Sequence, residues 1–99
     1  MEIKKNKEDG KLLLALSGRL DTLTAPQMED VVKNDMEGIT SLAIDLKDLT
    51  YVSSAGLRVL LMAQKTMNSR SGYMEICNVC EDIKEVFSIT GFADIFNIK

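Results

Sequence analysis

The chain has 99 residues, of which 45% are hydrophobic and 27% charged, as is ordinary for one soluble globular domain over residues 1–99. The net charge of −3 and the pI of about 4.9 argue against nucleic acid as a partner, because phosphate backbones select basic surfaces. No apolar run approaches the roughly 20 residues of a membrane span, and the N-terminus lacks the apolar stretch of a signal peptide. We therefore expect a cytoplasmic protein that binds neither nucleic acid nor membrane.

Two extended segments open the chain and are joined by Asp9-Gly10, a pair typical of tight hairpin turns. The first segment carries few apolar residues and is predicted as an edge strand, whereas residues 12–16 predict a strand buried on both faces. Residues 24–27 have the form of a capping box, with Leu23 and Met28 spaced to form a hydrophobic staple. A helix is expected to follow, because apolar side chains recur at helical spacing at Met28, Val31, Val32, Met36 and Ile39.

Strands and helices alternate in the rest of the chain. Residues 41–46 and 73–77 predict strands on either side of a second helix. Residues 78–81 repeat the capping-box pattern before a third helix that Gly91 would end, and a last short strand is expected around residues 95–96. This order predicts an α/β domain with an N-terminal β-hairpin, a mixed, mainly parallel sheet of about four or five strands, and helices packed against it.

The second helix is expected to begin at Ser53 or Ser54 and carries two large apolar side chains in an unusual place. Leu61 and Met62 lie on either side of Arg58, which marks the polar face of the helix. These two side chains either lean back over the edges of the core or belong to a partner-binding patch beside the serines. The sequence leaves both interpretations open.

Function in a parallel sheet concentrates at the edge where the strands end and the following loops gather. Three predicted loops arrive at this edge: residues 18–23, residues 49–54 and the turn at Asn78. Asp21 and Ser54, although distant in sequence, are therefore expected to lie near one another.

The chain contains no histidine, which excludes a Ser-His-Asp or Cys-His catalytic arrangement and a histidine-based metal site. Cys77 and Cys80 form a C-x-x-C pair, but a zinc site would need two further Cys or His ligands, and none exist. We interpret both cysteines as buried or half-buried structural residues; a thiol oxidoreductase is the alternative. No metal or cofactor is expected.

The stretch Ser53-Ser54-Ala55-Gly56 places two hydroxyls at the start of a helix, where unpaired backbone N–H groups favour an anion. It partly resembles the G-x-S-x-G nucleophile elbow of hydrolases, but Val52 stands in place of the first glycine and the chain has no histidine base. We therefore predict no enzymatic activity. A serine here either caps the helix or accepts a phosphate from another protein.

Residues 18–21 after one predicted strand and residues 45–57 after the next resemble the STAS-domain family of bacterial anti-sigma factor antagonists, and the similarity covers nearly the whole chain. In that family a partner kinase, which is also the anti-sigma factor, phosphorylates the first serine ahead of a small residue and glycine, which is Ser54 here. Family members commonly have Asp before this serine, so Ser53 is a rival acceptor.

The resemblance implies a protein-binding module switched by phosphorylation. The unphosphorylated form would sequester a GHKL-type anti-sigma factor serine kinase and so promote sigma-factor-dependent transcription, and a PP2C-type phosphatase would regenerate it. A phosphate would oppose docking, because desolvation of a dianion is costly and nearby carboxylates repel it. The predicted partner-binding residues are Asp21, Leu23, Tyr51, Val52, Ser53, Ala55, Gly56, Leu57, Arg58, Leu61 and Met62. The alternative is a STAS scaffold or sensor subunit that docks a protein or small ligand without serine phosphorylation.

Overall fold

In the computed structural model, which describes residues 1–99, the opening hairpin forms as predicted. Strands β1 (Glu2–Glu8) and β2 (Lys11–Leu20) pair antiparallel around Asp9 and Gly10, whose φ angles of 49° and 80° fit a tight turn that matches strand twist. Strand β1 lies at the edge of the sheet, and its exposed charged side chains protect that edge from pairing with another chain.

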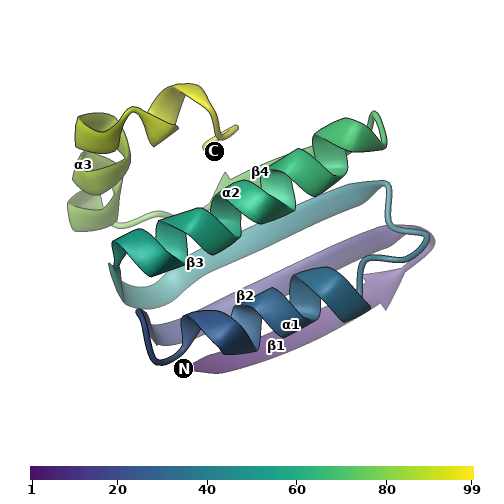
Figure 1. Ribbon diagram of the computed structural model, residues 1–99, viewed down its shortest axis with the longest axis horizontal. Helices are drawn as coiled ribbons and strands as arrows, with labels where there is room; N and C mark the ends of the chain where they lie inside the picture. The colour runs from purple at the N-terminus through teal and green to yellow at the C-terminus, as the bar shows by residue number, and fades with distance from the viewer.

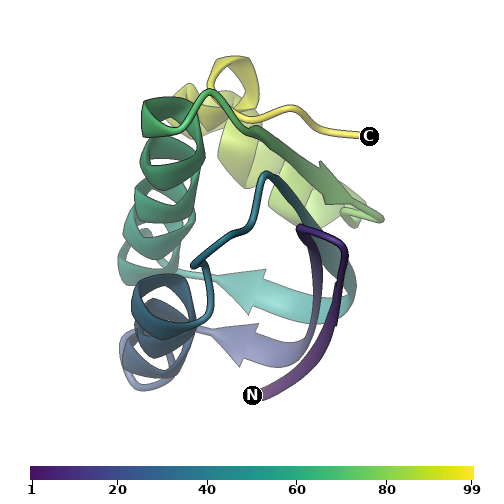
Figure 2. The same ribbon diagram turned by 90° about the vertical axis from the view of Figure 1, so that its right-hand side faces the viewer.

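Strands β3 (Ser41–Val52) and β4 (Tyr73–Cys77) extend the sheet in parallel, giving the order β1-β2-β3-β4. Helices α1 (Ala25–Asn34) and α2 (Ser54–Ser69) lie side by side on one face of this sheet (Figures 1 and 2). The other face of β1, β2 and β3 has no helix over it (Figure 2). None of the helices combines the length and apolar character needed to cross a bilayer.

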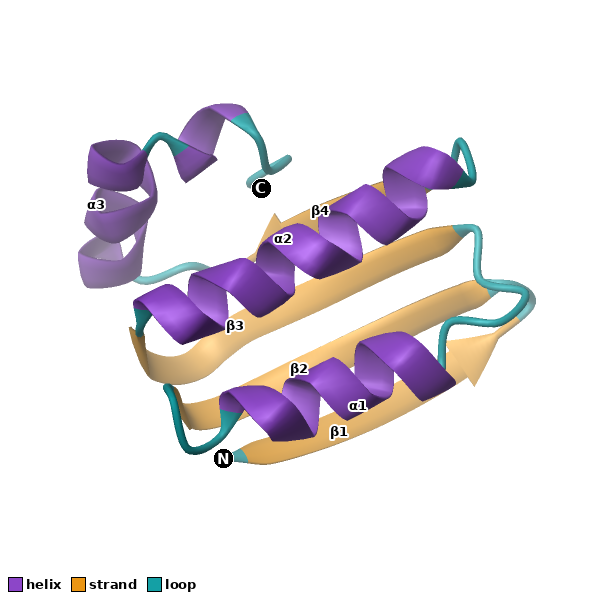
Figure 3. Ribbon diagram, viewed as in Figure 1, coloured by secondary structure: helices purple, strands orange, loops and turns teal.

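Helix α3 (Glu81–Thr90) and a short 3-10 turn, η1 (Phe92–Asp94), complete the chain beyond α2, on the side opposite to α1 (Figure 3). Gly91 separates them in the left-handed conformation, at φ 83°, as its predicted capping role requires. The final strand was predicted in the wrong place: Phe96 is buried in the core, and only Ile98 bridges to β4, opposite Ile76.

The core lies between the sheet and the helices as one cluster of 26 buried residues. Residues 12–16 show why two-sided burial was a wrong prediction for β2. Leu12, Leu14 and Leu16 are at most 2% exposed, whereas Leu13 is 40% exposed. Alternate side chains of a strand face opposite sides of the sheet, and helices cover only one side here.

Strand β3 is twice as long as the strand predicted over residues 41–46. The prediction stopped early because an irregularity in the strand interrupts the alternation of buried residues. The pairing with β2 skips a residue between Asp45 and Asp48, so Leu46 and Leu49 are both buried although three positions apart. Such a bulge restores the inward direction of the strand's apolar side chains. Residues 49–52 therefore belong to a strand and not to the predicted loop.

Helix ends account for the remaining differences. Helix α1 stops at Asn34; Met36 and Ile39 are buried beyond its end, where Arg70 donates hydrogen bonds to their carbonyl oxygens. Helix α3 is capped at Cys80 and makes no side-chain cap bond, so the predicted capping box at residues 78–81 is absent.

Candidate functional site

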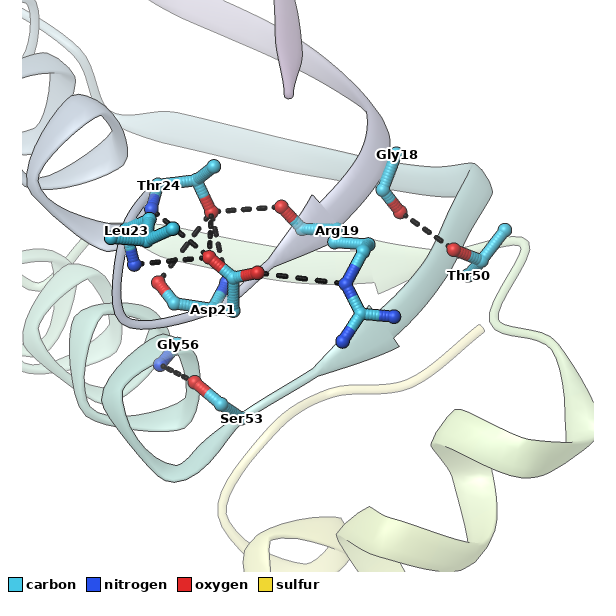
Figure 4. Close-up of polar contacts among 8 residues, drawn as sticks. All are labelled: Gly18, Arg19, Asp21, Leu23, Thr24, Thr50, Ser53 and Gly56. Atoms are coloured by element: carbon cyan, nitrogen blue, oxygen red, sulfur yellow. Dashed lines mark hydrogen bonds and ion pairs between the residues drawn. The ribbon is translucent and has the colours of Figure 1, made fainter.

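The ends of β2 and β3 bring the predicted serine and acidic positions together. Leu20 pairs with Val52, and the Ser53 backbone N–H donates to the Leu20 carbonyl oxygen at 2.9 Å. Asp21 and Ser53, the residues that follow these two strands, thus leave the sheet from neighbouring strand ends (Figure 4). The turn at Asn78 does not join them: β4 ends opposite Asp45, and the Asn78 amide bonds the Asp45 carboxylate at 3.1 Å.

The two serines occupy different positions at the start of α2. Ser53 is the N-cap; its Oγ accepts a hydrogen bond from the Gly56 N–H at 3.3 Å, and its carbonyl oxygen accepts one from the Leu57 N–H at 2.9 Å. Ser54 is the first helical residue, is exposed, and its hydroxyl makes no hydrogen bond within the chain. The structure therefore leaves one hydroxyl free for chemistry and uses the other for the fold.

Gly56 allows the start of α2 to lie directly against the ends of the two strands. A Cβ atom at this position would lie 2.7 Å from both the carbonyl oxygen and Cγ of Leu20, and 2.9 Å from a methyl carbon of Val52. Real Cβ atoms essentially never make such contacts, so only glycine permits this close approach. The free Ser54 hydroxyl therefore lies at a junction where the helix start packs tightly on the ends of β2 and β3.

The Asp21 carboxylate builds the turn after β2 (Figure 4). Its Oδ1 accepts hydrogen bonds from the backbone N–H groups of Leu23 and Thr24, at 3.0 and 3.1 Å. The Thr24 hydroxyl bonds back to Asp21 and to the carbonyl oxygen of Arg19 and makes no cap bond to α1, so the predicted capping box is wrong here too. Leu23 is 89% exposed, which also rules out its predicted staple with Met28.

The charge of Asp21 is compensated locally. Desolvation of this carboxyl raises its pKa, but hydrogen bonds from the Thr24 and Leu23 backbone, and then from the Thr24 hydroxyl, outweigh that effect. With a smaller contribution from Arg19, they hold the Asp21 pKa below its usual value. The Arg19 Nε lies 3.5 Å from Asp21 Oδ2, and its Cζ lies 4.2 Å from the centre of the Tyr51 ring.

Sequence reasoning missed Arg19, although a signal existed. Arg19 lies near the end of β2, two residues before Asp21, which directly follows the strand, and the parallel register places Tyr51 directly opposite Arg19. The first relation is visible in the sequence; the second needs the register, which the bulge in β3 conceals.

A groove of ≈ 630 Å³ runs between α1 and α2 beside the serine junction. Helix α2 contributes Ala55, Arg58, Leu61 and Met62 to its lining, all of which were predicted to bind a partner. Met62 also packs against the core, so it agrees with both interpretations of its place, and half-buried Leu61 agrees with the surface one. The groove offers a partner both apolar and charged side chains, and its lining begins on α2 at Ala55, the residue after Ser54.

The other predicted contacts divide by exposure. Tyr51 is 41% exposed and, with Leu23, extends the apolar surface around the junction. Val52, Gly56 and Leu57 are buried, so the Val52 and Leu57 side chains support the junction from inside, and none of the three residues is available to a partner. Their apolar character reflects packing of the core.

The cysteine pair lies outside this site. Cys77 is half-buried, as expected, but Cys80 is exposed, contrary to the expectation. Burial, together with the negative charges of Asp45 and Glu75, raises the pKa of the Cys77 thiol. A redox pair needs a thiolate with a lowered pKa, and the shift at Cys77 runs in the opposite direction. No group of three or more His, Cys, Asp or Glu side chains is arranged to hold a metal ion.

Known proteins resemble this chain in sequence and in fold. Residues 2–99 match the STAS domain family. BtrV of Bordetella bronchiseptica, which is named as an anti-sigma factor antagonist, is 34% identical over 99 residues, covering 99% of this chain and 85% of BtrV. The anti-sigma-B factor antagonist of Bacillus subtilis is 30% identical over 99 residues, covering 100% of this chain and 89% of that protein.

Among solved structures, the anti-sigma factor antagonist SpoIIAA in its unphosphorylated form has a TM-score of 0.79 at 14% identity, covering 99% of this chain and 87% of that one. The Bacillus SpoIIAA in its phosphorylated form has a TM-score of 0.78 at 15% identity, covering 99% and 91%. These structures have the same fold as the present chain. The sequence matches, which span almost the entire chain, show that it belongs to the STAS domain family.

Proposed function

We propose that this chain is an anti-sigma factor antagonist whose binding to its partner is switched off by phosphorylation of Ser54. The observation that carries the proposal is the free, exposed Ser54 hydroxyl on a rigid strand-to-helix junction, beside a partly apolar groove. The names of the relatives BtrV and the Bacillus subtilis anti-sigma-B factor antagonist support the function. The protein acts by binding and performs no catalysis of its own.

Ser54 is favoured over Ser53 as the acceptor on physical grounds. A kinase must reach the hydroxyl and orient it, and Ser54 is exposed and unbonded. The Ser53 hydroxyl is half-buried and caps α2 through the Gly56 N–H. A kinase acting on Ser53 would first have to release this hydroxyl from the cap.

A phosphate on Ser54 is compatible with the folded chain but opposes its docking to the partner. The first turn of α2 contains no acidic side chain, so the positive end of the helix dipole is uncompensated there. A dianion on Ser54 gains from this field while it remains in water. Docking would strip its hydration against the apolar groove, and a penalty of about 3–4 kcal/mol weakens binding by several hundredfold.

The partners follow from this function. The unmodified chain holds a GHKL-type serine kinase that serves as the anti-sigma factor, which frees the sigma factor for transcription. That kinase transfers the phosphate to Ser54, and a PP2C-type phosphatase removes it. These reactions take place in the cytoplasm.

The acceptor is tested by incubating the chain with its cognate kinase and ATP and locating the phosphate by mass spectrometry. Modification is expected at Ser54, absent in Ser54→Ala and retained in Ser53→Ala. Phosphate on Ser53, or none on either serine, would overturn the proposal. A chain that the kinase binds but leaves unphosphorylated in the presence of ATP would indicate the scaffold function instead.

The switch is tested with a matched pair of charge substitutions. Ser54→Asp should weaken kinase binding by at least about a hundredfold. Ser53→Asp adds the same charge one residue away while keeping a good N-cap, so its binding should remain within a few fold of wild type. Equal losses in the two variants would show that general negative charge, and not the position of Ser54, controls docking.

A further inference from the structure

Two arginines flank the serine junction, and the structure holds them differently. Arg19 is engaged by the Asp21 carboxylate and by the Tyr51 ring. Arg58 is exposed, takes part in none of the chain's ion pairs, and lies on the wall of the groove between α1 and α2. Only Arg58 is therefore free to accept a new anionic partner.

Arg58 also stands in the right place on the helix. It follows Ser54 by four residues, about 6 Å along the axis, on the same face of α2. Side chains in a helix lean toward its N-terminus, so Arg58 leans over the turn that begins with Ser54. An acidic group four residues before a basic one is the favourable order for such a pair.

Resting on the proposed function, we propose that Arg58 is the internal receiver of the Ser54 phosphate. The guanidinium forms a charge-assisted pair with the phosphate oxygens when Ser54 is modified. Phosphorylation then changes the docking surface in two ways: it adds a hydrated dianion, and it withdraws a free cation from the groove. The switch is thus partly a masking of Arg58.

Other charged groups near the groove are poorer receivers. Lys65 lines the same groove but lies 11 residues from Ser54, about 16 Å along the helix. Across the groove, the Glu29 carboxylate lies 3.8 Å from the Lys33 ammonium and takes part in no ion pair with Arg58. Lys65 is consequently a matched control: the same helix, the same groove and the same charge, out of reach of the phosphate.

The test uses the full chain with phosphoserine incorporated at position 54 during translation, so it does not depend on any kinase. Phosphorus NMR follows the second ionisation of the phosphoserine as the pH is raised. A neighbouring cation favours the dianion, so the second pKa in the wild-type background should lie about 0.3 below that in Arg58→Gln. Lys65→Gln should match wild type, and Arg58→Lys should recover part of the difference.

Equal phosphoserine pKa values in wild type and Arg58→Gln would overturn the role of Arg58, as would an equal shift in Lys65→Gln. Circular dichroism checks that each variant keeps its helices. The two proposals fail separately: a missing pKa difference leaves Ser54 as the acceptor, whereas a kinase that ignores Ser54 leaves the titration unchanged.

Discussion

Two of the three junctions where a parallel strand runs into a helix, β3–α2 and β4–α3, are built in opposite ways. At β3–α2, Ser53 caps the helix with its side chain, and the first turn of α2 has no acidic residue. At β4–α3, Cys80 makes no side-chain cap bond, and Glu81 and Asp82 already oppose the helix dipole. Burial, and then the negative charges of Asp45 and Glu75, also raise the pKa of Cys77 at the end of β4.

This difference shows how one topology can assign separate tasks to equivalent positions. Both junctions place small polar residues at a helix start. Only at the first is the positive end of the helix dipole left without an acidic side chain, so only there does the dipole favour an added anion. At the second junction, Glu81 and Asp82 already place negative charge in the first turn of the helix. Position in the fold alone thus does not identify a modification site; the local charge and the bonding of each side chain do.

The largest effect on the first junction is expected from Gly56→Ala. The new methyl group would collide with Leu20 and Val52, and such overpacking costs about 1–3 kcal/mol of unfolding free energy. Chemical denaturation measures this loss. The neighbouring Ala55→Ser change adds one atom at a half-buried position and should stay within about 0.5 kcal/mol. An unchanged midpoint for Gly56→Ala would mean that α2 does not need its close approach to the strands.

Cap removal should separate the two junctions next. Ser53→Ala deletes the bond to the Gly56 N–H and should reduce the free energy of unfolding by about 1 kcal/mol. Cys80→Ala deletes no cap bond, so its effect should be below about 0.5 kcal/mol. Parallel urea titrations compare them, and equal losses would contradict the assignment of the caps.

A smaller, pH-dependent effect is expected from Asp21→Asn. Because the pKa of Asp21 is lowered in the folded chain, its charge contributes stability above the unfolded pKa of about 3.9 and loses that contribution as the pH falls through the folded value. The melting temperature of wild type should exceed that of Asp21→Asn at neutral pH, and the gap should close in acid. A gap independent of pH would indicate a steric origin.

The cysteines should differ in reactivity without affecting the switch. Exposed Cys80 should react with iodoacetamide at neutral pH before half-buried Cys77, whose pKa is raised. Mass spectrometry of the partly labelled chain identifies the order. The double variant Cys77→Ser, Cys80→Ser should bind the kinase as wild type does, and a loss of binding would revive a role for the pair.

Local patterns predicted most of the fold. The turn at Asp9-Gly10, the edge position of β1 and the cap at Gly91 follow from residues that act on their own backbone. The bulge in β3 escaped prediction because it shifts the alternation of buried residues, so that Leu46 and Leu49 no longer read as one strand.

The candidate site was predictable in its position and less so in its contacts. Parallel topology alone brought Asp21 to the serine junction. The motif did not reveal which of the predicted contact residues are accessible to a partner. In the structure Val52 and Leu57 face the core, while Leu23 faces solvent. The pairing of Arg19 with Tyr51 depends on strand register, which spacing along the chain does not reveal.

The central claim is that a phosphate on Ser54 prevents docking without disturbing the fold. Isothermal titration calorimetry of the cognate kinase with the unmodified chain, and with the chain carrying phosphoserine at position 54, tests it most directly. We predict binding weakened by about a hundredfold or more in the modified chain, with an unchanged circular dichroism spectrum. Equal affinity of the two forms would contradict the account.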